Sequence, residues 1–128
     1  MLALSIRQPY AELILRGIKT IEFRSRATKI IGQRFHIYAA KAKTRLPAWS
    51  DDVQVGIPPP WMIELARQVK LIPPDADLAT GVIVGTAVIE RISQTHDGLW
   101  QWHLADVRRA KTLRKPRKQA QPVWFRPF

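Results

Sequence analysis

The chain has no cysteine among its 128 residues. This absence excludes disulfide bonds and any metal or redox site that depends on a thiolate, and it is typical of a reducing compartment. The sequence also lacks an apolar run of about 18 residues, the length that a membrane-spanning helix needs. No charged amino-terminal region followed by an apolar stretch, as in a signal peptide, is present. We therefore expect a cytoplasmic protein without a membrane partner.

Acidic residues are scarce at both ends of the chain. Ten Lys and Arg stand against two acids between Met1 and Ser50, and eight Lys and Arg against no acid after Asp106. The segment between them carries eight acids against three basic residues, and the net charge of the whole chain is +11. A basic surface built from the two ends is typical of a protein that binds a polyanion, and we infer nucleic acid; solubility alone is the simpler alternative.

The length and the apolar content of 46% predict a single globular domain over residues 1–128. Alternating and β-branched segments predict five or six short strands, at 2–6, 18–24, 34–41, 82–90, 99–109 and 123–125. Helices are predicted at 7–17 and from Pro60 to residue 69. Gly85 inside a strand indicates a bulge or a close approach of another backbone. We expect an α+β fold: a small mixed β-barrel of five to six strands flanked by two or three short helices.

The segment GIKTIEFR, residues 17–24, places three ionisable side chains in or next to a predicted strand. Glu22 and Arg24 are two residues apart, so they project from the same face of a strand. Lys19 joins them only if the turn after Gly17 directs it there. Three polar residues lie at the start of the preceding helix, whose amino terminus is a natural anion site: Arg7, Gln8 and Tyr10. The segment is either a solvated ion cluster of small energetic value or the floor of a binding cleft.

These residues resemble the hallmark of the ASCH domain family, a branch of the PUA-like β-barrels. The family pattern Gly-x-Lys-x-x-Glu-x-Arg is met by Gly17, Lys19, Glu22 and Arg24. The pattern Ser-x-x-Gln-Pro-aromatic, which precedes it, is met by Ser5, Gln8, Pro9 and Tyr10. The segments FHIYAAK, TGVIVGTAVI, WHLADVRR and PVWF resemble further strands of the family, so the similarity spans nearly the whole chain. The layout is similar to the ASCH domain of the activating signal cointegrator proteins.

The resemblance implies a cleft beside the barrel that binds RNA, a nucleotide or a modified nucleoside. The candidate cleft residues are Arg7, Gln8, Tyr10, Lys19, Glu22 and Arg24. A carboxylate such as that of Glu22 can accept a hydrogen bond from the exocyclic amine of cytosine, and it would also hold Lys19 or Arg24 in place. RNA is favoured as the ligand over single-stranded DNA or a free nucleoside, and no cofactor is expected.

An enzymatic alternative stays open. Some small ASCH proteins are amidohydrolases of N4-acylated cytidines that use a lysine, a threonine nucleophile and a glutamate, and others in the superfamily are ribonucleases. In either case Lys19 would be the base or charge stabiliser and Glu22 the general acid or base. However, Glu22 occupies the position of the family's nucleophilic threonine, and Thr20 follows the lysine by one residue instead of three.

The basic segment Arg108–Gln119 is predicted to be a solvated loop that contacts phosphates without reading sequence. Its candidate residues are Arg108, Arg109, Lys111, Arg114, Lys115, Arg117 and Lys118, and Lys41, Lys43 and Arg45 would join them from the segment after the strand at 34–41. Trp49 in that segment is a candidate for base stacking. The polar loop 46–60 either covers the cleft or leaves it open. The three histidines have no ligand-like spacing, so no metal site is expected.

Overall fold

The computed structural model describes residues 1–41 and 78–128. Within them the chain forms, in order, β1 (Ala3–Ile6), α1 (Tyr10–Leu15), β2 (Ile21–Arg24), β3 (Arg34–Ala39), β4 (Val82–Gln94), β5 (Trp100–Arg114) and β6 (Trp124–Phe125). The predicted helix at 60–69, the loop 46–60 and the side chains of Lys43, Arg45 and Trp49 lie outside the described residues. No helix in the described part of the chain is long and apolar enough to cross a membrane.

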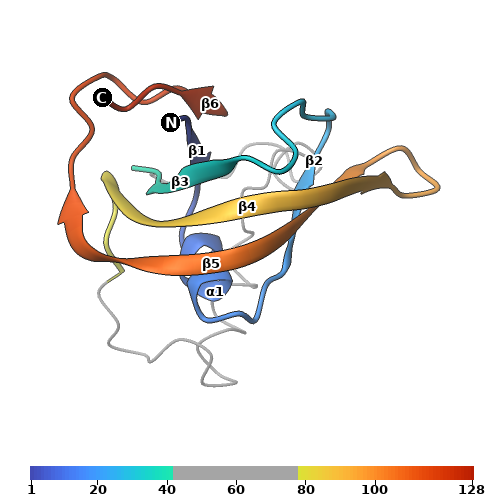
Figure 1. Cartoon of the computed structure of the whole chain (residues 1–128), viewed down its shortest axis with the longest axis horizontal. Coiled ribbons are helices and arrows are strands. Elements are labelled where there is room, and N and C mark those ends of the chain that lie inside the picture. The colour runs from blue at the N-terminus through green and yellow to red at the C-terminus, as the bar shows by residue number, and fades with distance from the viewer. Residues whose placement is uncertain (42–77) are drawn as a thin grey trace.

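The six strands form one mixed sheet in the order β2-β5-β4-β3-β1-β6, which curves into a half-barrel (Figure 1). β1 and β3 run parallel, and the long connection between them, which contains α1 and β2, allows this crossover. The other neighbouring strands are antiparallel. The strand-rich, mixed fold is thus confirmed. The sheet is open, however, with β2 at one end and β6 at the other, and α1 is the only helix in the described residues.

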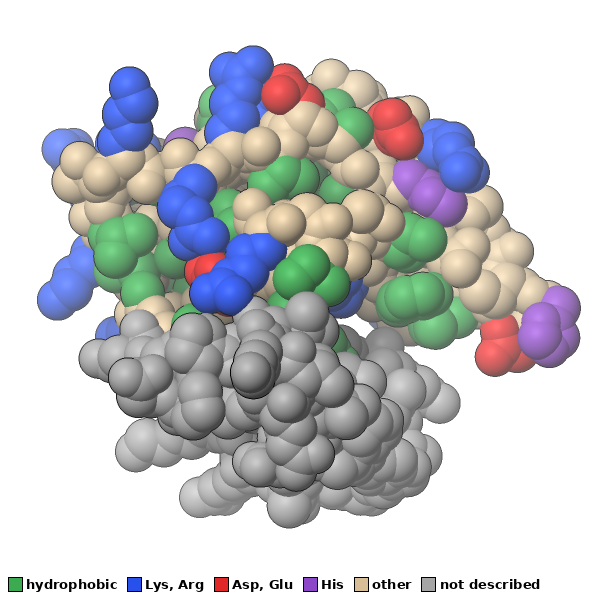
Figure 2. Space-filling model, turned by 90° about the horizontal axis from the view of Figure 1, so that it is seen from below, with side chains coloured by type: hydrophobic (Ala, Val, Ile, Leu, Met, Phe, Trp, Pro, Cys, Tyr) green, Lys and Arg blue, Asp and Glu red, His purple; other side chains and the backbone are tan. Residues whose placement is uncertain are grey.

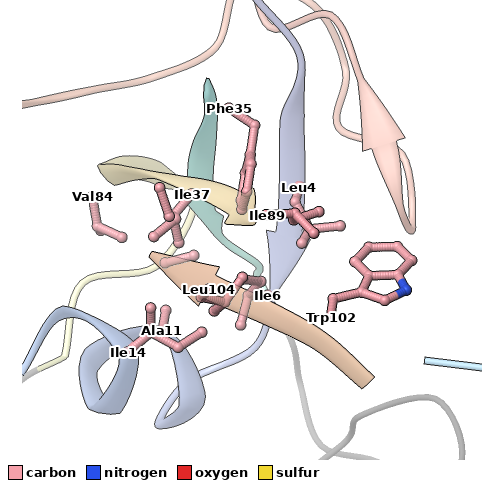
Figure 3. Packing of buried hydrophobic residues seen from close by; sticks show 12 residues of the cluster. Leu4, Ile6, Ala11, Ile14, Phe35, Ile37, Val84, Ile89, Trp102 and Leu104 are labelled. Carbon is pink, nitrogen blue, oxygen red and sulfur yellow. The ribbon is translucent and has the colours of Figure 1, made fainter. Parts of the chain in front are cut away.

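The hydrophobic core fills the inside of the curved sheet (Figure 3). Leu4 and Ile6 of β1 pack there with Ile37 of β3, and each of these side chains is at most 2% exposed. Ala11 and Ile14, three residues apart on one face of α1, pack against the same cluster. Burial of an aliphatic side chain of this size stabilises the fold by about 1.5–3 kcal/mol. The core therefore fixes α1 against the concave side of the sheet.

An aromatic contact connects β5 with β6. The indoles of Trp102 on β5 and Trp124 on β6 stack with their centroids 5.7 Å apart and their planes 9° from parallel. Phe35 of β3 packs edge-on against Trp124, with a centroid distance of 5.3 Å. This stack connects β5 with β6, which are not neighbours in the order of the sheet.

Gly85 shows both features predicted for it. The β4–β5 register shifts between Ile83 and Gly85, which is a bulge. A Cβ atom on Gly85 would lie 2.5 Å from the carbonyl oxygen of Arg108 and 2.6 Å from Cδ2 of Leu15. Only glycine allows β5 and α1 to come this close to the backbone of β4.

The predicted loop over Arg108–Gln119 is wrong for its first seven residues, which belong to β5. Gly85 pairs with Arg109 and Ile83 with Arg114, so residues 110–113 bulge out of the ladder and expose Lys111. The consecutive charges hide the alternation of polar and apolar residues from which a strand is predicted. These residues form part of β5 because they pair with β4. Only residues 115–123 form a connection between β5 and β6, and we refer to them as the strap.

Candidate nucleic-acid interface

Lys19, Glu22 and Arg24 meet at the start of β2. Glu22 accepts hydrogen bonds on both carboxylate oxygens, from Lys19 Nζ at 3.0 Å and from Arg24 Nη2 at 3.1 Å. Gly17 follows the end of α1 by two residues, and its φ of +74° is the left-handed conformation common after a helix. The amides of Ile18 and Lys19 both bond to the carbonyl of Leu13 in this turn. The turn therefore brings Lys19 to Glu22, and the geometric condition placed on Lys19 is met.

This ion cluster is buried, and β2 has its charged face turned inward. The side chain of Glu22 is 2% exposed and its partners Lys19 and Arg24 are 16% and 12% exposed, whereas the neighbouring Phe23 is 37% exposed. The guanidinium of Arg24 lies over the ring of Trp102, 5.8 Å from its centroid. A surface ion pair of small energetic value does not describe this arrangement, since all three charged groups have lost most of their contact with water.

Arg24 is held by more than its carboxylate. Its Nη2 also donates to the carbonyl of Ser5 at 2.9 Å. Its Nε is buried and has no hydrogen-bond partner among the described residues. Two fixed contacts on one nitrogen set the orientation of the planar guanidinium, and the group is positioned before any ligand arrives.

Tyr10 and Gln8 support the cluster from the helix side. Burial, together with the nearby negative charge of Glu22, raises the pKa of Tyr10 to about 12. The ammonium of Lys19 lies 5.2 Å from the centroid of the Tyr10 ring. Gln8 accepts from the amide of Glu12 and donates to the carbonyl of Ala79, both at 3.0 Å.

Three backbone amides of the first turn of α1 are not free to bind the anion expected at this amino terminus. The amides of Ala11, Glu12 and Leu13 are already bonded to Arg7, Gln8 and Pro9. Together with the contact to Ala79, the bonds of Gln8 make it a tie between α1 and the chain before β4, rather than a side chain pointing to a ligand.

A groove of about 1270 Å³ lies beside this cluster, on the open side of the half-barrel. Residues 24–27, at the end of β2, line one part of it, and the strap lines another. Seven basic side chains line the groove, and no acidic residue does so in the described part of the chain: Arg7, Arg24, Arg26, Lys41, Lys115, Arg117 and Lys118. Figure 2 shows Lys and Arg gathered mainly toward the end of the molecule away from the β4–β5 hairpin tip.

The strap is fixed along its length. Ser5 in β1 donates from its hydroxyl to the carbonyl of Gln121 at 2.5 Å and from its amide to the carbonyl of Val123 at 3.0 Å. The amides of Arg117 and Lys118 both donate to the carbonyl of Pro127. These bonds connect the strap to β1 at one end and to the chain after β6 at the other.

A close backbone contact positions Lys41 as well. Its side chain lies across Gly81, where an added Cβ atom would be 2.7 Å from Cε of Lys41. Gly81 has a φ of +74°, which favours glycine, and both residues line the groove. The absence of a side chain on Gly81 therefore leaves the space that the side chain of Lys41 occupies.

Comparison with models of known protein families assigns the chain to one of them. The ASCH domain model matches residues 4–121, which is nearly the whole sequence. The chain belongs to the ASCH domain family. A search for similar curated proteins found no match. The resemblance inferred from the motif is thus confirmed, and the motif residues of this ASCH domain are those that form the buried ion cluster.

Several predicted basic residues of this ASCH domain lie away from the groove. Arg109 binds Glu12 with two parallel hydrogen bonds of 2.9 Å, and Arg16 bonds the same carboxylate at 2.7 Å. These hydrogen bonds, above all those from Arg109, keep the pKa of Glu12 below its usual value although its burial opposes them. Arg108 pairs with Asp106. Phosphate contacts by Arg108, Arg109 and Lys111 stay predictions, and for Arg109 such a contact would compete with Glu12.

Arg26 is a groove residue that the sequence analysis missed. It is exposed and follows Arg24 by two residues, so the alternation used for Glu22 and Arg24 could have found it. Gln8, Tyr10, Lys19 and Glu22, in contrast, are not among the residues that line the groove. The groove itself therefore presents mainly Lys and Arg, with the motif's Arg24 as the link between the buried cluster and the open surface.

The described residues show no ready catalytic arrangement around Lys19. Thr20 is exposed, and Lys19 is engaged by Glu22 and by the carbonyl of Ile21. His103 pairs with Ile21 across the β2–β5 ladder, but its side chain contacts Ser93 and Arg91. No group of three His, Asp or Glu side chains suited to a metal ion is found in residues 1–41 and 78–128.

Proposed function

We propose that this ASCH domain is a nucleic-acid-binding module and that its ligand is RNA. The observation that carries the proposal is the groove, where seven basic side chains converge and no acidic side chain is found among the described lining residues. A surface of one sign that is concave and close to low-dielectric core attracts a polyanion more strongly than scattered charges do. The net charge of +11 acts in the same direction.

The contacts of this proposal are made mostly with phosphates. Lys115, Arg117 and Lys118 on the strap line the groove together with Arg7 and the end of β2. Neutralised phosphates release condensed counterions, so affinity comes largely from salt-dependent, sequence-independent contacts. Membership of the ASCH family is consistent with RNA as the polyanion.

Glu22 has a supporting role in this proposal. Both of its oxygens are already bonded and its side chain is 2% exposed, so its charge serves first to hold Lys19 and Arg24. Without it, two like charges would lie side by side in a site with little water. A direct contact between Glu22 and an exocyclic base amine stays a prediction.

Salt dependence tests the proposal. We expect fluorescence anisotropy with a single-stranded RNA of about 12 nucleotides to show binding that weakens steeply between about 50 and 200 mM salt. Each phosphate contact adds about −0.7 to the slope of log K against log salt. Arg117→Gln and Lys118→Gln should each remove about that amount. Lys29→Gln is the matched control, because Lys29 is exposed and does not line the groove.

An affinity that is flat over this range of salt would contradict the proposal. Equal affinity for single-stranded DNA of the same sequence would contradict the assignment to RNA. The same samples test the enzymatic alternative: RNA and N4-acetylcytidine are incubated with the wild type and with Lys19→Ala. Recovery of both substrates unchanged supports binding without catalysis, and turnover that Lys19→Ala abolishes would favour a hydrolase.

A further inference from the structure

A second hollow, of about 540 Å³, adjoins the groove. Its described lining consists of Arg114, Lys115, Arg117 and Phe128. Lys115 and Arg117 also line the groove, so the strap presents basic side chains to both spaces. A polyanion that lies in the groove can continue over the strap into this hollow without meeting an acidic side chain in the described part of the chain.

The hollow contains an exposed aromatic ring, which the groove lacks. Phe128 is 42% exposed, whereas Trp102 and Tyr38 in the groove are 2% and 4% exposed. Trp124 is engaged by Trp102 on one side and by the edge of Phe35. The groove therefore offers mainly charge, and the hollow offers an open ring surface together with charge.

The ring of Phe128 is held in position. The guanidinium of Arg114 lies over it, with Cζ 4.4 Å from the ring centroid. His36 packs edge-on at a centroid distance of 5.9 Å, and its buried Nδ1 has no hydrogen-bond partner among the described residues. The preceding residue, Pro127, is bonded through its carbonyl to the amides of Arg117 and Lys118. Ring and strap are thus coupled through the backbone.

We propose that the hollow is a stacking site for one unpaired nucleobase, which packs on the Arg114–Phe128 pair while its flanking phosphates contact Lys115 and Arg117. The proposal rests on the proposed function and adds the class of ligand: a single-stranded segment of RNA. Guanidinium planes and aromatic rings are the two side-chain surfaces on which exposed bases stack, and phosphates lie on both sides of each base. Paired bases inside a duplex have both faces covered and cannot use the site.

The test compares Phe128→Leu with Phe128→Tyr. Loss of a stacking side chain weakens binding by about tenfold per base, and Phe128→Leu should show this loss on a single-stranded oligouridylate of about 12 nucleotides. The salt slope should not change, because no charge is removed. Phe128→Tyr should restore the affinity. A duplex RNA of the same length should bind the wild type and Phe128→Leu equally well.

Three binding results would overturn the stacking site. They are single-strand affinity unchanged in Phe128→Leu, equal losses on single strand and duplex, and no rescue by Phe128→Tyr. Thermal unfolding of each variant checks that the fold is kept. In the wild type, the ring signals of Phe128 in NMR spectra should move upfield on addition of the oligouridylate, and unmoved signals at saturation would also overturn it. Failure of the wild type to bind RNA would instead refute the proposed function.

Discussion

The substitution Glu22→Gln tests whether the ion cluster contributes to stability as a buried ion pair does or only as a surface salt bridge does. The amide keeps the shape of the carboxylate but removes its charge, and it turns an NH2 group toward Lys19 or Arg24, both of which are donors. The three side chains are 2%, 16% and 12% exposed, in the order Glu22, Lys19, Arg24. Removal of one member of a buried pair costs about 3–5 kcal/mol, whereas an exposed pair contributes about 0–1 kcal/mol.

We expect a loss near the lower end, about 3 kcal/mol, because both cations keep some exposure and can recruit water. In urea, with an m-value of about 1.5 kcal/mol per M, the unfolding midpoint should fall by about 2 M. Glu90→Gln is the matched control: Glu90 is exposed on β4 and has no ion pair within the described residues, so its substitution should change stability by less than about 0.5 kcal/mol.

Urea titration followed by tryptophan fluorescence measures both variants under the same conditions. A loss in Glu22→Gln below about 1 kcal/mol would refute the reasoning, because it would place the cluster among ordinary surface ion pairs. A changed m-value together with the shifted midpoint would indicate that the native state itself has been altered, and circular dichroism of the folded variant tests that possibility.

Three further predictions concern the close contacts and the titrating groups. Gly85→Ala should lower the free energy of unfolding by about 3 kcal/mol, because the added Cβ meets the backbone of β5. Gly32 has open space around it but a positive φ, so Gly32→Ala should lower it by about 1 kcal/mol, and thermal unfolding compares the two variants. Glu12→Gln should destabilise the protein by about 2 kcal/mol at neutral pH, because it loses charged hydrogen bonds to Arg109. Since the pKa of Glu12 is lowered in the fold, the difference in unfolding free energy between variant and wild type should vanish as the pH falls below about 4, which urea titrations measure. The pKa of Tyr10 is raised to about 12 in the fold, so its contribution to stability should be complete below about pH 10 and should be lost as the pH rises toward about 12. Phenolate absorbance and alkaline unfolding measure this loss, and the part of it that Tyr10 causes should be missing in Tyr10→Phe.

The local parts of the site could be predicted from the sequence. Strand alternation put Glu22 and Arg24 on one face, and the turn at Gly17 ended the helix where expected. Such features depend on residues only a few positions apart, so their geometry follows from backbone periodicity. The family pattern favoured the cleft over the surface interpretation, a choice that alternation alone left open. The structure shows the cluster to be buried, and of its three residues only Arg24 lines the groove.

The charge of the two chain ends predicted a shared basic surface, but it could not predict which residues form the walls of the groove. The contact of Ser5 with Gln121 depends on β6 pairing with β1, and nothing near either residue signals that pairing. The same holds for Arg109, which was expected to meet phosphate but bonds to a carboxylate 97 residues away. The basic segment was taken for a loop because its charges mask the strand, whose partner β4 is known only from the sheet order.

The pairing of β1 with β6 also sets the order in which the site can be completed during synthesis. Ala3 pairs with His36 and with Phe125, so β1 can complete its pairing only when β6, which is synthesised later, is available. Contacts between residues so distant in sequence form slowly, because a long loop must close before they stabilise anything. When β1 to β5 of a nascent chain have emerged from the ribosome and β6 has not, one wall of the groove is still missing. The proposed binding of RNA should therefore appear late in folding, only after β6 has paired with β1.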